Sequence, residues 1–252
     1  MADGRVSGKR CLIWGGGSGI GRAGAEALLR DGAAVFLAGR RGAVVAEAAA
    51  VLGAAGHAAG DATLSADAAR VTAEAAQAMG GIDTLLISAG QGGVTPTGAT
   101  SEAAFQSIID QNLRPVFLAV HHALPHLRHA GQGAIIAISS MYGLVGQRER
   151  LAYCAAKAGV NGMVRAMALD LADARIRVNA VCPGFVETDL ALAVAAQEAD
   201  PQASLRAKRA MHPIPRGGTL AEMGAIVVYL ASDESAFMTG QALAVDGGYT
   251  AR

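Results

Sequence analysis

Short apolar runs alternate with longer alanine-rich segments along this sequence, and that alternation restricts the possible folds more than any other feature. The runs are almost continuous in hydrophobicity, as in strands covered on both faces. Alternating strands and helices indicate a single doubly wound parallel α/β sheet with helices on both faces. We predict strands at 10–14, 34–38, 83–88, 134–139, 176–181 and 242–245, a weaker seventh strand at 57–60, and helices at 19–31, 42–54, 65–79, 101–130, 152–172 and 219–231.

The chain is long enough for one large α/β domain, and no feature divides it. Of its 252 residues, 52% are hydrophobic and 17% are charged, which is too apolar for a disordered chain. No linker rich in Pro, Gly and Ser interrupts the alternation. We therefore predict one domain over 1–252. Residues 189–215 have no strand partner and run into "HPIPRGG", so we expect them to form a small lid.

Charge and cysteine content argue against several functions. Lys plus Arg equals Asp plus Glu at 21 each, so no net charge attracts nucleic acid or an acidic membrane. The N-terminus "MADGRVSGKR" lacks an apolar signal segment, and no run approaches the roughly 18 apolar residues of a membrane span. Cys11, Cys154 and Cys182 form no CxxC pair, which favours free thiols in a reducing compartment. We expect a cytoplasmic protein without a membrane or nucleic-acid partner.

A glycine-rich loop follows the first predicted strand and begins the first predicted helix. Gly15, Gly19 and Gly21 in "CLIWGGGSGIGRAG" are spaced GxxxGxG. Glycines there permit a tight turn and let backbone N–H groups approach a pyrophosphate at a helix N-terminus. An ordinary tight turn is the alternative, but the strand–loop–helix context favours a dinucleotide site.

Tyr153 and Lys157 in "AYCAAKAG" are four residues apart and would share one face of a helix. Taken alone, such a pair usually lies on a solvent-exposed face of a helix and has no catalytic role. Reduction of a carbonyl needs a proton donor, and a tyrosine beside a cation can supply one, because the cation lowers the phenol pKa from about 10. The pair therefore predicts acid–base chemistry if the glycine loop binds a nicotinamide cofactor.

From Lys9 to Tyr249 the chain resembles the short-chain dehydrogenase/reductase family. The family's TGxxxGxG falls on Trp14 to Gly21, its YxxxK on Tyr153 and Lys157, and its serine on Ser140 of "AIIAISS", thirteen positions before Tyr153. Further matches are Asn112 in "DQNLRPVF", Pro183 and Gly184 with Thr188 in "NAVCPGFVETDL", and the closing "VDGGY". Two positions depart from the pattern: Trp14 replaces a threonine and Ser88 in "ISAG" replaces an asparagine. The family's fold places these two positions close together. The large Trp14 side chain could therefore compensate for the shorter Ser88 side chain, or the two changes could be unrelated.

The resemblance implies a Rossmann-like NAD(P)-dependent oxidoreductase acting on a carbonyl/alcohol pair. It makes Tyr153 the acid, Lys157 its partner and a ribose ligand, Ser140 the donor to the substrate oxygen, and Asn112 part of a proton relay to solvent. Pro115 lacks an N–H, so the carbonyl of Gln111 loses its helical partner there. The cofactor residues it implies are Gly15, Gly17, Ser18, Gly19, Ile20, Gly21, Arg40, Arg41, Asp61, Ala62, Ser88, Ala89, Gly90, Tyr153, Lys157, Pro183, Gly184, Val186 and Thr188.

The end of the second strand, "FLAGRRG", favours NADP over NAD as the cofactor. The family's acidic position aligns with Gly39, which cannot repel a 2′-phosphate, while Arg40 can bind one and Arg41 adds positive potential. By resemblance Asp61 contacts the adenine amino group. Many NADP-preferring members carry a basic residue where Ser18 stands here, so NAD stays possible.

Several alternatives remain open from the sequence. A 3-oxoacyl thioester reductase and a dinucleotide-binding regulatory protein without catalysis are the alternative functions. His122, His126 and His129 could share a helix face, but no further ligand motif accompanies them and we predict no metal. Arg148 and Arg150 in "RERL" lie between Ser140 and Tyr153 and could contact an anionic substrate. The small residues around Tyr153, the zero net charge and the family resemblance predict a homotetramer with a small-molecule carbonyl/alcohol substrate.

Overall fold

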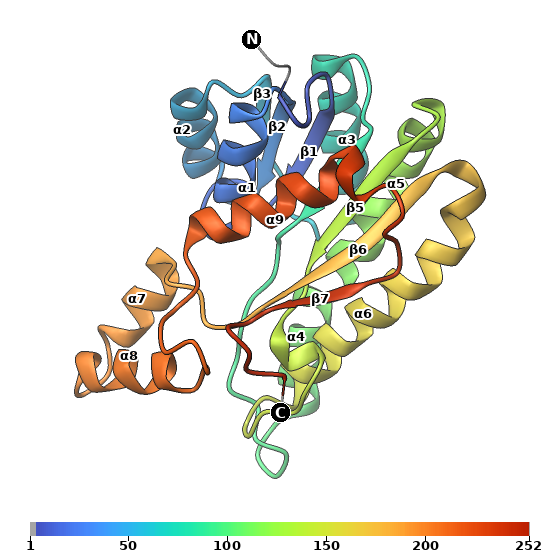
Figure 1. Cartoon of the computed structure of the whole chain (residues 1–252). Helices are drawn as coiled ribbons and strands as arrows, with labels where there is room; N and C mark the ends of the chain where they lie inside the picture. Colours follow the sequence, from blue (N-terminus) through green and yellow to red (C-terminus); the bar gives the residue numbers. More distant parts are fainter. Residues whose placement is uncertain (1–3, 252) are drawn as a thin grey trace.

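The computed structural model describes residues 4–251, so the domain predicted over 1–252 extends beyond the described residues at both ends. Its centre is one seven-stranded sheet in the order β3-β2-β1-β4-β5-β6-β7, and every pair of neighbouring strands is parallel (Figure 1). The strands are β1 (Arg10–Trp14), β2 (Ala34–Gly39), β3 (Gly56–Ala59), β4 (Thr84–Ile87), β5 (Gly133–Ile138), β6 (Ile176–Pro183) and β7 (Ala242–Val245). The predicted doubly wound parallel α/β sheet is confirmed.

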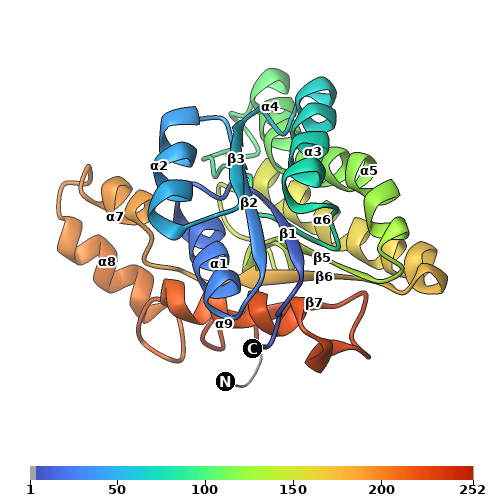
Figure 2. The ribbon, with the colours of Figure 1, turned by 90° about the horizontal axis from the view of Figure 1, so that it is seen from above.

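Helices cover both faces of the sheet, which explains why the central strands are apolar at nearly every position. The helices are α1 (Gly19–Arg30), α2 (Gly42–Leu52), α3 (Ser65–Met79), α4 (Glu102–Asn112), α5 (Arg114–His129), α6 (Leu151–Leu171), α7 (Asp189–Ala195), α8 (Pro201–Ala210) and α9 (Leu220–Ala231). In the view along the sheet, α1, α2 and α9 lie on one side and α3 to α6 on the other (Figure 2). Two hydrophobic cores result, one on each face, and successive strand residues alternate between them. Within residues 4–251, no helix combines the length and the apolar character needed to cross a bilayer.

The single helix predicted at 101–130 is wrong, because the structure has two helices separated at Leu113. Pro115 stands in the first turn of α5 and has no N–H to donate. The N–H of Val116 donates to the carbonyl of Leu113 (3.2 Å) instead of the Asn112 carbonyl, which an unbroken helix would use. The break leaves Asn112 as the last residue of α4, directly before the change of direction.

Strand order reverses between β1 and β4, and this position determines where a ligand can bind. In such sheets the loops after neighbouring strands part at the reversal and leave a crevice at the carboxyl ends. The glycine loop leaves β1 at this edge, and the segment containing Ser88 leaves β4 beside it; the Ser88 N–H donates to the Trp14 carbonyl (2.8 Å).

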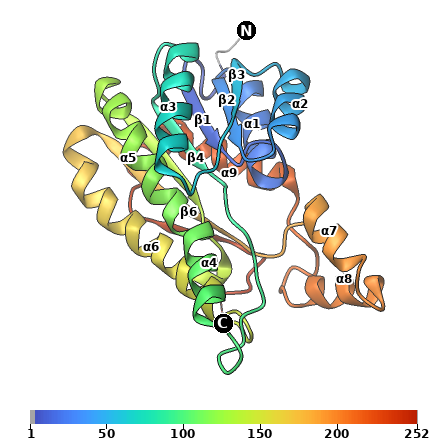
Figure 3. The same cartoon turned by 180° about the vertical axis from the view of Figure 1, so that it is seen from behind.

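The lid segment, residues 189–215, contains the short helices α7 and α8, which the sequence did not predict. These helices project from the body beside the end of β6 (Figure 3). Arg209 on α8 forms a two-bonded ion pair with Glu187 (2.8 and 3.0 Å). Buried His212 accepts from the Phe185 N–H (3.2 Å) through Nε2, and its Nδ1 lies 2.6 Å from the Asp246 carbonyl oxygen. These contacts attach the end of the lid segment to the loops after β6 and β7.

Candidate active site

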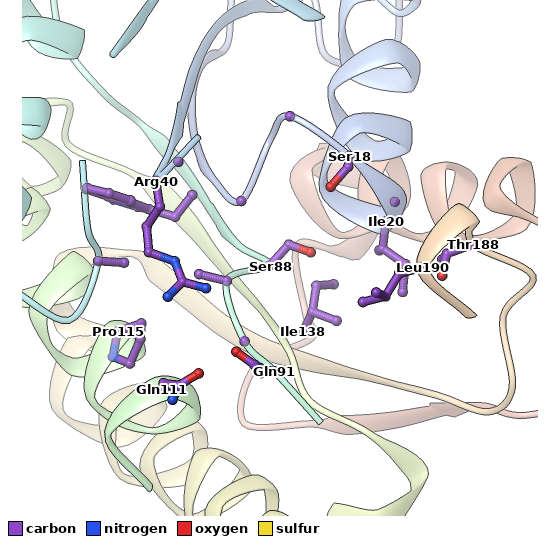
Figure 4. Close-up of a pocket in the computed structure, with 18 of the residues that line it drawn as sticks. Ser18, Ile20, Arg40, Ser88, Gln91, Gln111, Pro115, Ile138, Thr188 and Leu190 are labelled. Carbon is purple, nitrogen blue, oxygen red and sulfur yellow. The ribbon is translucent and has the colours of Figure 1, made fainter. Parts of the chain in front are cut away.

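A cleft of about 700 Å³ opens at the carboxyl ends of the strands, at the reversal point (Figure 4). It runs from the glycine loop to the start of α6 and brings together almost all of the predicted site residues. Those that line it are Gly15, Gly17, Ser18, Gly19, Ile20, Arg40, Arg41, Asp61, Ala62, Ser88, Ala89, Gly90, Ser140, Tyr153, Lys157, Pro183, Gly184, Val186 and Thr188. Two predicted residues, Gly21 and Asn112, are not among the lining residues.

The glycine loop has the backbone that its sequence predicted. Gly15 (φ +80°) and Gly19 (φ +53°) adopt left-handed conformations that favour glycine. Ser18 caps α1 without a side-chain hydrogen bond, so the first backbone N–H groups of the helix stay available to an anion. A Cβ on Gly21 would overlap the carbonyl oxygen of Gly15, so Gly21 keeps the loop closed against the helix instead of lining the cleft.

Two arginines, Arg40 and Arg41, directly follow β2 and line the cleft near the glycine loop. Both side chains are exposed. Figure 4 shows Arg40 extending into the cleft, and Arg41 donates from Nη2 to the Ser18 hydroxyl (3.0 Å), which joins the second strand's end to the glycine loop. Asp61 lines the same end, where its Oδ1 accepts from the N–H (2.9 Å) and the hydroxyl (2.8 Å) of Thr63.

Tyr153 and Lys157 stand one turn apart on α6, as predicted, and both face the cleft. Lys157 is only 4% exposed, and its Nζ donates to the Ile138 carbonyl at the end of β5 (2.9 Å). Its Nζ lies 5.7 Å from the centre of the Tyr153 ring. Burial, which penalises the charged form, lowers the Lys157 pKa to about 8. The ammonium is therefore close to titration at neutral pH.

The pKa of Tyr153 moves opposite to the sequence prediction. Burial of the phenol raises it, because a phenolate would lose its hydration. A hydrogen bond with Ser140 and the charge of Arg150 act in the opposite direction without reversing the shift. Tyr153 is thus held as the protonated phenol in the free protein, a form that can donate a proton.

Asn112 lies behind the cleft and fixes the segment after β4. Its Nδ2 donates to the carbonyls of Gln91 (2.8 Å) and Ile108 (2.9 Å), and its Oδ1 accepts from the Gln91 N–H (3.2 Å). An added Cβ at Gly90 would lie 2.8 Å from that Oδ1 and 3.3 Å from the Lys157 Nζ. Gly90 therefore separates the Asn112 amide from the Lys157 ammonium, and only a glycine fits between them.

The two departures from the family pattern do not form a compensating pair. Trp14 is fully buried in the core on the side of α3 and α5, in register with Ile87. The Ser88 side chain points to the other face, where its Cβ would lie 3.1 Å from a Cβ added at Gly21 on α1. The backbones of Trp14 and Ser88 are hydrogen bonded, but their side chains lie on opposite sides of the sheet.

Other cleft residues were missed from the sequence, and two of them carry unsatisfied polar atoms. Within residues 4–251, Trp14 Nε1 and Gln111 Oε1 are buried without a hydrogen-bond partner. A polar ligand in the cleft could satisfy such atoms, which supports the fit of a dinucleotide. The missed lining residues include Gln91 and Gly92, which directly follow predicted Gly90, and Gln111 and Pro115, which flank Asn112. Their adjacency to predicted positions was the available signal.

The structure treats differently the two other sites considered from the sequence, the histidines of α5 and the arginines before α6. Among residues 4–251 no group of three His, Cys, Asp or Glu side chains is placed to hold a metal, and His122 instead contacts the Ser65 hydroxyl through Nε2 (3.0 Å). Arg148 is exposed. Arg150, by contrast, is partly buried and donates from Nη1 to the Gly93 carbonyl (2.7 Å).

Comparison with known proteins agrees with this geometry. A family model described as "Enoyl-(Acyl carrier protein) reductase" matches residues 15–250. The chain is 37% identical over 252 residues to 2-(S)-hydroxypropyl-CoM dehydrogenase 3 of Xanthobacter autotrophicus, covering 98% of each chain. It is 39% identical over 245 residues to cis-4-hydroxycyclohexanecarboxylate dehydrogenase of Sinomonas cyclohexanicum, covering 95% of this chain and 96% of that one. A crystal structure of a putative short-chain dehydrogenase/reductase from Burkholderia xenovorans superposes with a TM-score of 0.93 at 32% identity, covering 99% of each chain.

The chain therefore belongs to the short-chain dehydrogenase/reductase family. Within that family it is an NAD(P)-dependent oxidoreductase that acts on CH–OH groups and the corresponding carbonyls.

Proposed function

We propose that Tyr153, Ser140 and Lys157 are the catalytic groups of this oxidoreductase, and that the cleft binds NADP(H) next to a secondary alcohol or its ketone. The observation that carries the proposal is the continuity of the cleft, which joins the glycine loop to Tyr153, Lys157 and Ser140. A non-catalytic regulatory protein would need the glycine loop but not an acid with an oriented cation beside it. The relatives' substrates, which include a hydroxycyclohexanecarboxylate and cyclohexanol, support a hydroxyl on a mainly apolar carbon skeleton.

The residues present suit a dinucleotide along the whole cleft. The N–H groups at the start of α1 face the position of a pyrophosphate, and Gly15 and Gly19 keep that approach free of side chains. Arg40, with Arg41 held at Ser18, supplies positive charge where a 2′-phosphate would lie, and Gly39 supplies no acid to repel it. These residues support a preference for NADP.

The nicotinamide ring, when bound, accepts or donates the hydride. Tyr153 donates its phenolic proton to the carbonyl oxygen during reduction and takes it back during oxidation. Ser140 hydrogen-bonds the same oxygen as negative charge builds there, and its own orientation is fixed because its Oγ accepts from the Tyr142 N–H (3.2 Å). The Lys157 ammonium stabilises the phenolate that Tyr153 becomes.

Proton return to Tyr153 needs a path to solvent, and the break between α4 and α5 supplies the groups for one. The Asn112 amide fixes Gly90 and Gln91 beside Lys157, and the Val116 N–H is turned away from the Asn112 carbonyl. Within residues 4–251 that carbonyl then lacks its helical N–H donor, and it can accept from a water that relays protons from solvent to Lys157 and so to Tyr153.

Replacement of Tyr153 by phenylalanine tests the proposal. Tyr153→Phe removes only the acid, so kcat for reduction of a panel of cyclic and acyclic ketones with NADPH should fall by about 10²–10⁴-fold. Calorimetric NADPH affinity should stay within about three-fold, because the cofactor contacts remain. Tyr229→Phe, on α9 and outside the cleft lining, is the matched control. A wild type that binds NADPH but reduces no ketone would instead favour the regulatory protein.

Two further proposals concern the state of the protein in the cell. We propose a homotetramer, because the exposed residues of α6 include small Ala155, Ala158 and Ala166 and the apolar Leu169 beside the charged Arg165 and Asp170. We also propose a cytoplasmic location, with Cys11, Cys154 and Cys182 present as the free thiols suited to a reducing compartment.

A further inference from the structure

A second cation, Arg150, lies close to the proposed catalytic centre and has no part in the mechanism above. It is the residue before α6 and stands three positions before Tyr153, about one helical turn from it. Arg150 and Gly93 are not among the residues that line the cleft, but Gln91 and Gly92, which do line it, directly precede Gly93, and the Gly93 carbonyl accepts the Arg150 hydrogen bond.

The position of Arg150 is fixed from two sides. Its Nη1 donates to the Gly93 carbonyl (2.7 Å), and its backbone forms a parallel bridge with Thr95. Thr95 itself donates to the Glu149 carbonyl (2.7 Å) and accepts from the Leu151 N–H (3.2 Å). The guanidinium is therefore placed by the fold, unlike that of an exposed arginine at the end of a mobile stem.

One edge of this guanidinium is left for a ligand. Within residues 4–251 the only hydrogen bond of the Arg150 side chain is the one from Nη1, so the donors on Nε and Nη2 are unused. Those two nitrogens form the side-on edge that matches the two oxygens of a carboxylate. The Arg150 charge also reaches the centre, because it lowers the pKa of both Tyr142 and Tyr153 against the larger effect of burial.

An apolar wall stands beside the cation. The rings of Tyr142 and Tyr249 meet edge to face with centroids 6.2 Å apart, and the Tyr249 hydroxyl donates to Gln147 Oε1 (3.4 Å). Tyr142 and Tyr249 are not among the residues that line the cleft, but the Arg150 charge acts on Tyr142, so this aromatic pair lies near the cation.

We infer that Arg150 binds the carboxylate of the substrate, so that the preferred substrates are hydroxy acids and oxo acids whose reacting carbon lies at Tyr153. This inference rests on the proposed function and narrows it to a substrate class. Arg150 acts as a substrate-binding residue and takes no part in proton transfer. Arg148, two residues earlier, has an exposed side chain without a hydrogen bond or ion pair in residues 4–251, and it is not assigned this role.

The test compares charged and neutral substrates of the same shape. The probes are 3-hydroxybutanoate, 4-hydroxypentanoate and 4-hydroxycyclohexanecarboxylate, each beside its primary amide, with kcat/KM measured for oxidation by wild type, Arg150→Gln, Arg150→Lys and Arg148→Gln. In the wild type, kcat/KM for at least one acid should exceed kcat/KM for its amide by about ten-fold or more. Arg150→Gln should lower that acid/amide ratio about 10- to 100-fold, the range for a lost charge-assisted bond, because kcat/KM falls further for the acid than for the amide.

The other two variants distinguish the effect of the Arg150 charge from the effect of its two-bonded geometry and of its position. Arg150→Lys should keep part of the ratio, because it retains the charge and loses the two-bonded geometry. Arg148→Gln should leave the ratio unchanged. The inference is overturned if no acid exceeds its amide, if Arg148→Gln lowers the ratio instead, or if Arg150→Gln slows acid and amide equally, which would show that Arg150 only holds the Gly93 segment. If no alcohol is oxidised at all, the proposed function fails, and calorimetric binding of the same acids and amides to wild type and Arg150→Gln still decides the role of Arg150.

Discussion

The buried ammonium of Lys157 should make the stability of the free protein depend on pH. Lys157 has a pKa of 10.5 when unfolded and about 8 when folded. Between these values the unfolded chain binds more protons than the native one, so stability rises with pH across this window. At 1.36 kcal/mol for each pH unit between 8 and 10.5, the charged form costs the fold about 3 kcal/mol below pH 8.

We therefore compare the free energies of unfolding of Lys157→Met and the wild type at two pH values. The difference in favour of the variant should be larger below pH 8 than near pH 10.5, and the variant should lose activity. The measurement is the free energy of unfolding of both proteins by urea at fixed protein concentration and without cofactor, from pH 7 to 10.5. The advantage of the variant should shrink by about 2–3 kcal/mol across that range. A difference that stays constant with pH would mean that the lysine is not destabilised by burial.

Arg40 is the residue to which we attribute the proposed preference for NADP. Arg40→Asp replaces a charge-assisted contact to a 2′-phosphate by a repulsion, and it adds an acceptor for ribose hydroxyls. The ratio of kcat/KM for NADPH to that for NADH should fall by at least about 30-fold, with Arg40→Gln between wild type and Arg40→Asp. A wild type that uses both cofactors equally, or prefers NADH, would contradict the assignment.

At this scale, residue identity was predictable but electrostatic environment was not. The four-residue spacing of Tyr153 and Lys157 and the position of Ser140 before them were readable directly, and all three meet in the cleft. The raised pKa of Tyr153 depends on how much protein surrounds the phenol, which spacing cannot report. The position of Asn112 behind the cleft likewise depends on the exact place where α4 ends.

Among the elements, the crossing of α1 and α9 depends on glycine. A Cβ at Gly224 of α9 would lie 2.9 Å from the Ala23 carbonyl oxygen and 2.9 Å from the Ala27 Cβ, both on α1. A backbone oxygen cannot move aside as a side chain can, so the helices would have to separate.

Gly224→Ala should therefore destabilise the protein by about 1–3 kcal/mol, although alanine is the better helix former. Ala225→Ser, at the exposed neighbouring position, is the control and should stay within about 0.5 kcal/mol of wild type in urea unfolding. A Gly224→Ala protein as stable as the wild type would show that the two helices can repack without this close approach.

Most element types were predictable because six of the seven strands are short apolar runs, and because α1, α2, α3 and α6 are long helices rich in alanine and glycine. The missed break at Leu113 has a local cause, Pro115, but the residues on both sides continue a helical pattern and hide it. The two helices of the lid segment were missed for another reason. Their N-caps are Thr188 and Asp200, whose side chains accept from the N–H groups of Ala191 and Ala203. These caps are short signals in a segment without a core pattern.

For the whole molecule, the surface of α6 that faces away from the sheet is the best marker of assembly. Ala155, Ala158 and Leu169 are exposed along it, and Gly162 has no atom within 4 Å of an added Cβ. Leu169 is 81% exposed, an unusual position for a leucine in a helix packed on a core.

If the proposed tetramer forms through this surface, Leu169→Glu should leave each folded chain intact and yield smaller species, because it places a charge in an apolar contact. Light scattering at micromolar concentration measures the mass, and circular dichroism checks the fold. Val51→Glu on α2, where the valine is 65% exposed, is the control and should remain tetrameric. A wild-type monomer, or a Leu169→Glu tetramer, would contradict this interface.

The strand order and the two-sided covering follow from the alternation of strands and helices and the right-handed crossovers it requires. The cleft follows in turn, because the glycine loop has to leave β1 at the reversal point. What surrounds the substrate could not be predicted in this way. Tyr142 and Arg150 lie in the one segment between β5 and α6, whereas Tyr249 lies near the C-terminus, and only the fold brings its ring against that of Tyr142.

Trp14 has an optical consequence. It is the single tryptophan in the chain, and it is wholly buried in the wall of the cleft. Indole emission overlaps the absorption band of a reduced nicotinamide and not that of the oxidised form. The fluorescence of this one residue should therefore be quenched by energy transfer when the reduced dinucleotide occupies the cleft, and it should recover as the dinucleotide is oxidised. The enzyme thus carries an intrinsic fluorophore whose brightness reports cofactor redox state during turnover, without any label.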